Sequence, residues 1–334
     1  MGGQYICGVD IGGTWIRVGI CTYDLKEENI LRKTAKTPKD HQLAISEKVC
    51  ELLNELLIEN GVGKHQLMGI GLASAGPFDM EKGEIFNNAN LGFKIIPLKE
   101  PIRDKFPRIP IYLINDCNAA VLGVHYFEAE EEEADNLVYI TISTGIGGGV
   151  ICNGRLLLGK EGNAAEVGHG LVEPKSQIKC NCGAYGCWEV YSSGTGVRKR
   201  AQTELNEGVL KGNKLLKLVK NDPTKITAKE VFKAARKGDD SSKKIVEDCI
   251  FYTKVGFGLV NNFYDCVTIY VGGAMMNDSD VILPPIQKAF EDNPIIFTIN
   301  KPPKIKKTRL GEDVGLCGAL SLVKYKYEKH RIVF

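Results

Sequence analysis

The chain has 334 residues, 43% of them hydrophobic, so it is long enough for two ordinary domains with substantial cores. With 43 basic and 41 acidic residues its net charge is only +2, which argues against nucleic acid or a membrane surface as the main partner. We expect neither a signal peptide nor a membrane span, because the N-terminal pattern and a long apolar run that these need are both missing. Most of the eleven cysteines lie scattered in apolar surroundings, as expected for reduced core residues in a cytoplasmic protein that acts on small molecules.

The first half of the chain alternates between predicted strands and helices. A hairpin opens it, with strands over 5–11 and 15–23 on either side of the turn Gly12-Gly13-Thr14. Helical spacing of apolar residues predicts a helix over 42–60, which Gly61 ends. The next predictions are a strand over 67–73, a helix over 97–106, a buried strand over 111–114 and a helix over 117–127, ended by a solvated acidic run over 130–133.

The second half repeats the order of strand, glycine-rich turn and strand. Strands over 137–143 and 148–152 flank its turn, helices follow over 192–204, 228–237 and 241–264, and a strand over 267–271 leads into Gly272-Gly273. After a helix over 281–290, we interpret the basic segment 301–307 as a surface loop and 315–325 as a closing helix packed on the first half. The recurrence predicts an α/β fold with two related halves.

The two glycine-rich turns are candidate phosphate sites: Asp10-Ile11-Gly12-Gly13-Thr14 and Thr144-Gly145-Ile146-Gly147-Gly148-Gly149. Successive N–H groups in such turns form an anion-binding concavity, and glycine lets a phosphate approach closely. A strand follows both turns and neither contains Gly-Lys-Ser/Thr, which argues against Rossmann and Walker A motifs. One turn in each half favours a nucleotide site of the actin and hexokinase type between two lobes, with Asp10 as a ligand for Mg²⁺. Two hairpin turns without a ligand are the alternative.

An Asn115-Asp116 pair stands at the end of a buried strand and the start of a helix. Ligands of open α/β sheets bind outside the carboxyl ends of strands, so this is a position for catalysis. Asp116 could equally cap the following helix, which would stabilise it by about 1 kcal/mol. A carboxylate with an ordinary pKa of about 3.9 is a weak base for an alcohol, so a catalytic Asp116 would orient the hydroxyl and accept its proton late.

A candidate metal centre follows in the stretch 162–189. His169 precedes a C-x-C-x4-C cluster formed by Cys180, Cys182 and Cys187. Three thiolates and an imidazole are the donor set of a closed, tetrahedral structural zinc site. Gly183 and Gly186 allow the tight turns that such a short loop needs. A chance cluster and a disulfide are the alternatives.

Taken together and in order, these motifs resemble the ROK family of sugar kinases over residues 6 to about 320. The resemblance is carried by Asp10 to Thr14, Asn115 to Ala120, Thr141 to Gly149, Glu166 to His169 and Cys180 to Glu189. It implies a two-lobed, actin/hexokinase-like (ribonuclease H-like) ATPase fold with a cleft for nucleotide and sugar. The small lobe would comprise 1–115 and about 315–334, and the large lobe 116–314 with a zinc loop over 169–187. A homodimer or higher homo-oligomer is also implied.

The implied activity is transfer of the γ-phosphoryl group of ATP, with Mg²⁺, to the 6-hydroxyl of a hexose, as a glucokinase does in glycolysis. Asp116 would be the base. The sugar would be bound by Asn90, Asn115, Asp116, Glu166, His169 and Glu189. The nucleotide would lie against Asp10, Gly12, Gly13, Thr14, Thr144, Gly145, Gly147, Gly272 and Gly273. His169 would also bind structural Zn²⁺ together with Cys180, Cys182 and Cys187.

Two departures from the family pattern bear on the sugar. Ala165 stands where the family often has glycine before the glutamate, and the segment 88–93 varies where proline and tryptophan are common. Gly76-Pro77 precedes Asp79 where some N-acetylmannosamine kinases carry arginine, which favours glucose. N-acetylmannosamine or N-acetylglucosamine is the alternative substrate. A sugar-responsive repressor would need a DNA-binding segment before Asp10, and an inactive sugar sensor is disfavoured by the intact Asp116.

Overall fold

The computed structural model describes residues 4–88, 91–206, 214–292 and 298–330, so Asn90 lies outside the described residues. The chain packs as two compact units. The first comprises Met1–Ala134, Leu156–Ala164 and Arg309–Phe334, and the second comprises Asp135–Arg155 and Ala165–Thr308. Among the described helices, none has the length and apolar character needed to cross a membrane. The lobe boundaries implied by the family resemblance stay a prediction.

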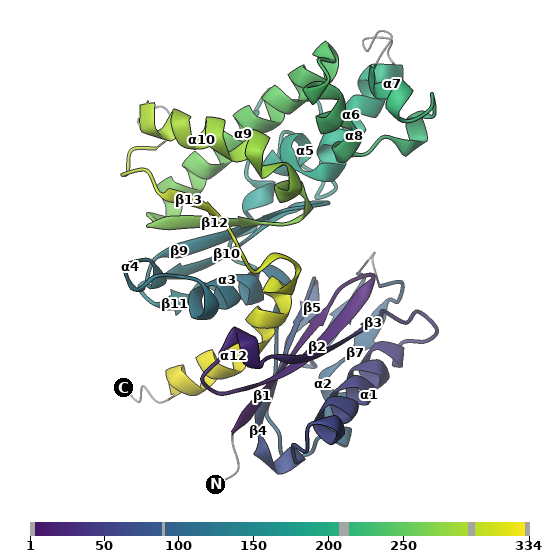
Figure 1. Ribbon diagram of the computed structural model, residues 1–334, viewed down its shortest axis with the longest axis vertical. Coiled ribbons are helices and arrows are strands. Elements are labelled where there is room, and N and C mark those ends of the chain that lie inside the picture. Colours follow the sequence, from purple (N-terminus) through teal and green to yellow (C-terminus); the bar gives the residue numbers. More distant parts are fainter. Residues whose placement is uncertain (1–3, 89–90, 207–213, 293–297, 331–334) are drawn as a thin grey trace. The chain divides into compact units, whose positions relative to one another are not determined.

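A five-stranded sheet with the order β3-β2-β1-β4-β8 forms the middle of the first unit (Figure 1). Its strands are β1 (Tyr5–Ile11), β2 (Trp15–Thr22), β3 (Leu31–Lys36), β4 (Leu67–Ser74) and β8 (Ile111–Asn115). β1 and β2 form the predicted hairpin, whereas β4 runs parallel to β1 and β8 runs parallel to β4. A smaller sheet, β5-β6-β7, contains Phe78–Asp79, Glu84–Phe86 and Ile95–Pro97.

Helices cover both faces of the first sheet. The helices of this unit are α1 (Ala44–Glu59), α2 (Lys99–Lys105), α3 (Asp116–Phe127), α4 (Glu131–Ala134) and α12 (Val314–His330). Alternate residues of β1, namely Cys7, Val9 and Ile11, share one buried core with α1 and α2. The closing helix α12 packs against β1, β4 and α3, as predicted.

A row of three glycines lets α12 lie directly on the sheet. Gly8 pairs with Gly19 of β2 and with Gly71 of β4. A Cβ on Gly8 would come within 2.6 Å of Leu320 N, and a Cβ on Gly71 would overlap Ala319 O. Because the obstructing atoms belong to the helix backbone, a side chain here could be accommodated only by moving α12.

The second unit repeats the hairpin and parallel strand of the first around another five-stranded sheet, β11-β10-β9-β12-β13. Its strands are Arg155–Leu156 (β11), Ile146–Cys152 (β10), Leu137–Ile142 (β9), Thr268–Gly272 (β12) and Lys304–Lys307 (β13). β9 and β10 are antiparallel, and β12 is parallel to β9. The helices are α5 (Trp188–Ser192), α6 (Gly194–Asn206), α7 (Lys214–Leu218), α8 (Ala228–Arg236), α9 (Asp240–Tyr264) and α10 (Ser279–Asp292). The predicted repeat is confirmed.

Some local predictions were wrong. Segment 301–307 is no loop over its whole length, because Lys304–Lys307 pairs with β12 and buries Ile305. The acidic run is not wholly solvated, since Glu133 is fully buried. The helix predicted over 192–204 is α6, Gly194–Asn206, but the short helix α5 that precedes it, Trp188–Ser192, was missed. Strand β3 was missed because its residues are mostly exposed and give no clear apolar alternation.

Gly71→Ala tests the close contact between α12 and the sheet. Alanine is normally the better strand residue, but here its Cβ overlaps the backbone of Ala319, so we expect a loss of at least 1–3 kcal/mol in the free energy of unfolding, as an order-of-magnitude estimate. Urea denaturation measures it. Gly19→Ala is the matched control, because its Cβ would meet movable side-chain ends, those of Leu316 at 3.2 Å and Ile30 at 3.4 Å, and the loss should be smaller. Equal stability of both variants would contradict the packing argument.

Candidate active site and metal centre

The carboxyl ends of β1, β4 and β8 bring polar residues to one edge of the first sheet. In the register, Ile11 lies beside Ser74 and Ser74 lies beside Asn115. Asp10 and Asp116 directly adjoin these positions in the chain, and the negative charge of Asp116 helps to raise the pKa of Asp10. The structure therefore brings together the predicted magnesium ligand and the predicted base. Such an edge is the usual ligand site of a parallel sheet.

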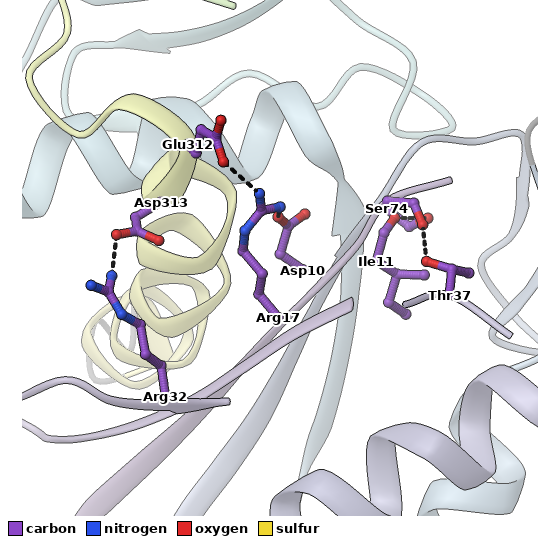
Figure 2. A network of polar contacts seen from close by, with 9 residues as sticks. Asp10, Ile11, Arg17, Arg32, Thr37, Ser74, Glu312 and Asp313 are labelled. Atoms are coloured by element: carbon purple, nitrogen blue, oxygen red, sulfur yellow. Dashed lines mark hydrogen bonds and ion pairs between the residues drawn. The ribbon is translucent and has the colours of Figure 1, made fainter. Parts of the chain in front are cut away.

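The carbonyl groups around the first glycine turn are occupied by hydrogen bonds. Ser74 Oγ donates to Ile11 O at 3.1 Å, and Thr37 Oγ1 donates to Gly12 O at 2.6 Å (Figure 2). The turn is closed by Gly12 N donating to Trp15 O at 2.9 Å. With its acceptors bonded within the protein, a glycine turn presents mainly N–H dipoles to a ligand, which suits an anion.

Asp10 is held by an arginine that sequence reasoning missed. Arg17 Nη1 lies 3.3 Å from Asp10 Oδ2, and Arg17 Nη2 lies 3.1 Å from Glu312 Oε2 (Figure 2). The signal was present in the hairpin, because Asp10 and Arg17 are cross-strand partners in its register. On another side, Gly315 in the first turn of α12 packs so closely that a Cβ there would lie 2.7 Å from Asp10 Cγ.

The surroundings of Asp10 oppose its ionisation. Loss of hydration is the largest cause and raises the pKa of this carboxyl to about 6. The charge of Arg17 and its hydrogen bond lower the pKa, while the negative charges of Asp116 and Asp313 raise it. Asp10 thus becomes a carboxylate only near neutral pH, and a bound cation would favour that form.

Helix α3 is capped mainly by Asn115, the residue before Asp116. Asn115 is the N-cap of α3, with its Oδ1 accepting from Cys117 N at 2.8 Å and from Asn118 N at 3.4 Å. The Asp116 carboxylate also accepts from Cys117 N, at 2.9 Å, which fixes its orientation. Loss of hydration raises the pKa of Asp116, and the Cys117 N–H partly offsets that rise. A desolvated, oriented carboxylate that is not needed as the cap is available for proton transfer.

The second glycine turn borders a pocket of about 720 Å³ that lies within the second unit. Its lining includes Ser143 and Thr144 of the turn and Ala274 and Met275, which follow the predicted Gly272-Gly273 pair. Gly273 has a φ of +92°, so glycine is required there. The pocket also has cationic side chains that the sequence did not single out, from Arg198, Lys229, Lys233 and Arg236. Its size and charge suit a nucleotide.

The four predicted metal ligands converge. The ligand atoms of His169, Cys180, Cys182 and Cys187 all lie within 4.8 Å of one another. Cys182 Sγ is 3.7 Å from Cys187 Sγ, and Cys180 Sγ is 3.6 Å from His169 Nδ1. A tetrahedral ion with Zn–S bonds of about 2.3 Å places its sulfur ligands about 3.8 Å apart, so these separations fit zinc and are far too long for a disulfide. Gly183 and Gly186 have φ values of +97° and +73°, as the tight turns required.

Two predicted sugar ligands of the second unit adjoin this centre: His169 belongs to it, and Glu189 Oε1 lies 3.9 Å from Cys180 Sγ. Glu166 and His169 are both exposed. His169 is the last residue of the short 3-10 helix Val167–His169, and Glu166 directly precedes that helix. Ala165 has a φ of +65°, which explains why glycine is common at this position; alanine there costs about 1 kcal/mol. Glu189 Oε2 accepts from Ile146 N at 2.9 Å, in the second glycine turn. None of these contacts tests sugar binding, so those assignments stay predictions.

The five-stranded sheet in each unit and the similarity to solved sugar kinases define the class of protein. It is an α/β protein with the actin/hexokinase-like fold of sugar kinases. More particularly, the chain belongs to the ROK family, whose sequence profile matches residues 6–326. The glucokinase of Halalkalibacterium halodurans is 32% identical over 97% of this chain and 96% of its own length. A ROK hexokinase from Thermus thermophilus is 27% identical with a TM-score of 0.80, covering 98% of this chain and 100% of that one. A ROK glucokinase from Streptomyces griseus, solved with glucose and AMPPNP, is 28% identical with a TM-score of 0.70, covering 96% and 99%.

Arg17→Met tests whether Arg17 keeps Asp10 ionised. Because Arg17 lowers the pKa of Asp10, its loss should raise that pKa further above about 6, so the acid limb of the pH profile of kcat/KM should move to higher pH. Arg17→Lys keeps the charge and should restore part of the shift. Glu312→Gln is the matched control, because Glu312 is 92% exposed and contacts Arg17 alone in this network. An unchanged acid limb in Arg17→Met would show that Asp10 does not limit activity.

Proposed function

We propose that this protein is an ATP-dependent hexose kinase that phosphorylates the 6-hydroxyl of glucose. The observation that carries the proposal is the desolvated Asp116 carboxylate, oriented by Cys117 N beside Asp10 at the carboxyl edge of the first sheet. The similarity to glucokinases along nearly the whole chain supports the same substrate. Phosphoryl transfer needs an oriented alcohol, a proton acceptor and a phosphate cradle, and the predicted residues supply each of these.

In the proposed reaction, Asp116 accepts a hydrogen bond from the sugar 6-hydroxyl and takes its proton as the oxygen attacks the γ-phosphorus. The bond from the γ-phosphorus to the bridging oxygen breaks, and ADP leaves with the electron pair of that bond. The raised pKa of Asp116 makes it a better proton acceptor than an ordinary aspartate, because its strength as a base moves toward the operating pH. The hydrogen bond from Cys117 N holds the carboxylate in one orientation. Positioning of this kind supplies a large part of catalysis in phosphoryl transfer.

The nucleotide is proposed to occupy the pocket beside Thr144, with its phosphates against the glycine turns. Asp10 is proposed to hold Mg²⁺, which would neutralise charge on the transferred group. The cationic side chains from α6 and α8 that line the pocket favour the anionic nucleotide by electrostatic attraction.

The metal centre is proposed to hold one structural Zn²⁺ per chain. Its four donors complete a tetrahedral shell, which leaves no position for a reacting water. We therefore assign the centre to holding the loop that carries His169 and Glu189. The proposed use of ATP and eleven cysteines without a disulfide among them agree with a cytoplasmic enzyme of glycolysis, and we propose a homodimer by analogy with the family.

Sugar-dependent ADP production with Mg-ATP tests the proposed function. We expect turnover with glucose above that with mannose, N-acetylmannosamine and N-acetylglucosamine, and a fall in kcat of about 10²- to 10⁴-fold in Asp116→Asn. The matched control is Asp104→Asn at an exposed position, which should leave kcat unchanged. Faster turnover with an N-acetylated sugar would identify that sugar, and not glucose, as the substrate. No turnover with any sugar would refute the proposed kinase activity.

Metal analysis tests the zinc assignment separately. We expect about one zinc ion per purified chain, and Cys182→Ser should release it because a serine hydroxyl is a poor replacement for thiolate at zinc. Cys152→Ser changes a cysteine outside the cluster and should keep the metal. Metal-free wild-type protein with full thermal stability would contradict a structural role.

A further inference from the structure

We propose that Glu189 and the residues after it connect the metal loop, residues 169–187, to the second glycine turn, so that the metal supports nucleotide binding even without sugar. Glu189 then acts as a positioning residue for the nucleotide, beyond its predicted contact with sugar. This inference rests on the proposed function, because it assumes that the pocket beside Thr144 is the nucleotide site.

The first link is the carboxylate of Glu189. Its Oε2 accepts a hydrogen bond of 2.9 Å from Ile146 N, and it lies so close to Gly145 that a Cβ on that residue would overlap it. The same side chain is half-buried, with Oε1 3.9 Å from Cys180 Sγ. Glu189 thus lies between a metal ligand and the turn.

The second link is the backbone that follows Glu189. Gly194 N donates to Ser143 O at 2.7 Å, and Thr195 N donates to Thr144 O at 3.4 Å. Together with Glu189, these residues bind the carbonyl groups of Ser143 and Thr144 and the N–H group of Ile146. The turn's conformation, and hence the direction of its remaining dipoles, depends on where the segment 189–195 lies.

The third link is the attachment of this segment to the metal loop. Cys187 belongs to the proposed metal centre and is also the N-cap residue of α5, the helix that carries Glu189. Trp188 N donates to Gly170 O at 2.9 Å, and Leu171 forms a β-bridge with Cys187. Trp188 is buried with its ring edge-on to Phe257, at 5.7 Å between centroids. An ion that fixes Cys187 would therefore fix the start of α5 and, through it, the turn.

ADP binding to sugar-free protein, measured by calorimetry with Mg²⁺, tests this inference. Glu189→Ala leaves Ile146 N without its acceptor and should raise the Kd about 10-fold, whereas Glu189→Gln keeps an acceptor oxygen and should change it less than about 3-fold. Glu173→Ala is the matched control, because that carboxylate belongs to the metal loop and bonds Tyr252 Oη at 3.1 Å. It should bind ADP as the wild type does.

Metal removal completes the test. Chelation of the metal should raise the Kd of the wild-type protein for ADP about 10-fold. It should raise the Kd of Glu189→Ala by less than a further factor of about 2, because both changes break the same connection. Unchanged ADP binding by Glu189→Ala, or equal effects of chelation on both proteins, would overturn the inference while leaving the kinase intact. Failure of metal-loaded wild type to bind ADP would overturn both. Thermal melting confirms that each variant is folded.

Discussion

The two candidate phosphate sites depend on hydrogen bonds that occupy the carbonyl groups of the two hairpin turns. In the first unit, Ser74 and Thr37 donate to the carbonyls of Ile11 and Gly12; in the second, Gly194 and Thr195 donate to those of Ser143 and Thr144. Side-chain hydroxyls in the first unit and backbone N–H groups in the second thus occupy the carbonyl groups of the turns. A turn whose acceptors are already bonded offers a ligand its N–H groups, so each of these turns is suited to a phosphate group.

The first unit also shows how packing produces an unusual carboxylate. Gly8 and Gly71 lack side chains where the backbone of α12 lies closest to the sheet, and Gly315 brings the helix against Asp10. That contact excludes water, and desolvation raises the pKa of Asp10 despite the nearby Arg17. Keeping Asp10 ionised at neutral pH therefore costs folding stability, and this cost is largest above the raised pKa and absent below the ordinary one. A divalent cation offsets that cost when it binds.

The sequence predicted the repeated hairpins, the closing helix and the convergence of His169 with the three cysteines of the cluster, because glycine turns, apolar periodicity and cysteine spacing are local signals. It left open whether Asp116 caps α3, and the hydrogen bonds of Asn115 show that this residue fills the capping role. Arg17 and the cations of the pocket were missed because their importance arises from strand register and helix packing. Buried Glu133 and strand β13 were misjudged for the same reason: charged residues give a surface signal that tertiary contacts override.

Amide hydrogen exchange at short labelling times, with and without Mg-ADP, tests most directly whether the two turns bind phosphate. The account predicts slower exchange in peptides spanning residues 11–15 and 143–147 when the nucleotide binds, because their N–H groups then donate to phosphate oxygens. Protection of the pocket residues of α8 shows that the nucleotide is bound. Slower exchange there, with no change at either turn, would contradict the account.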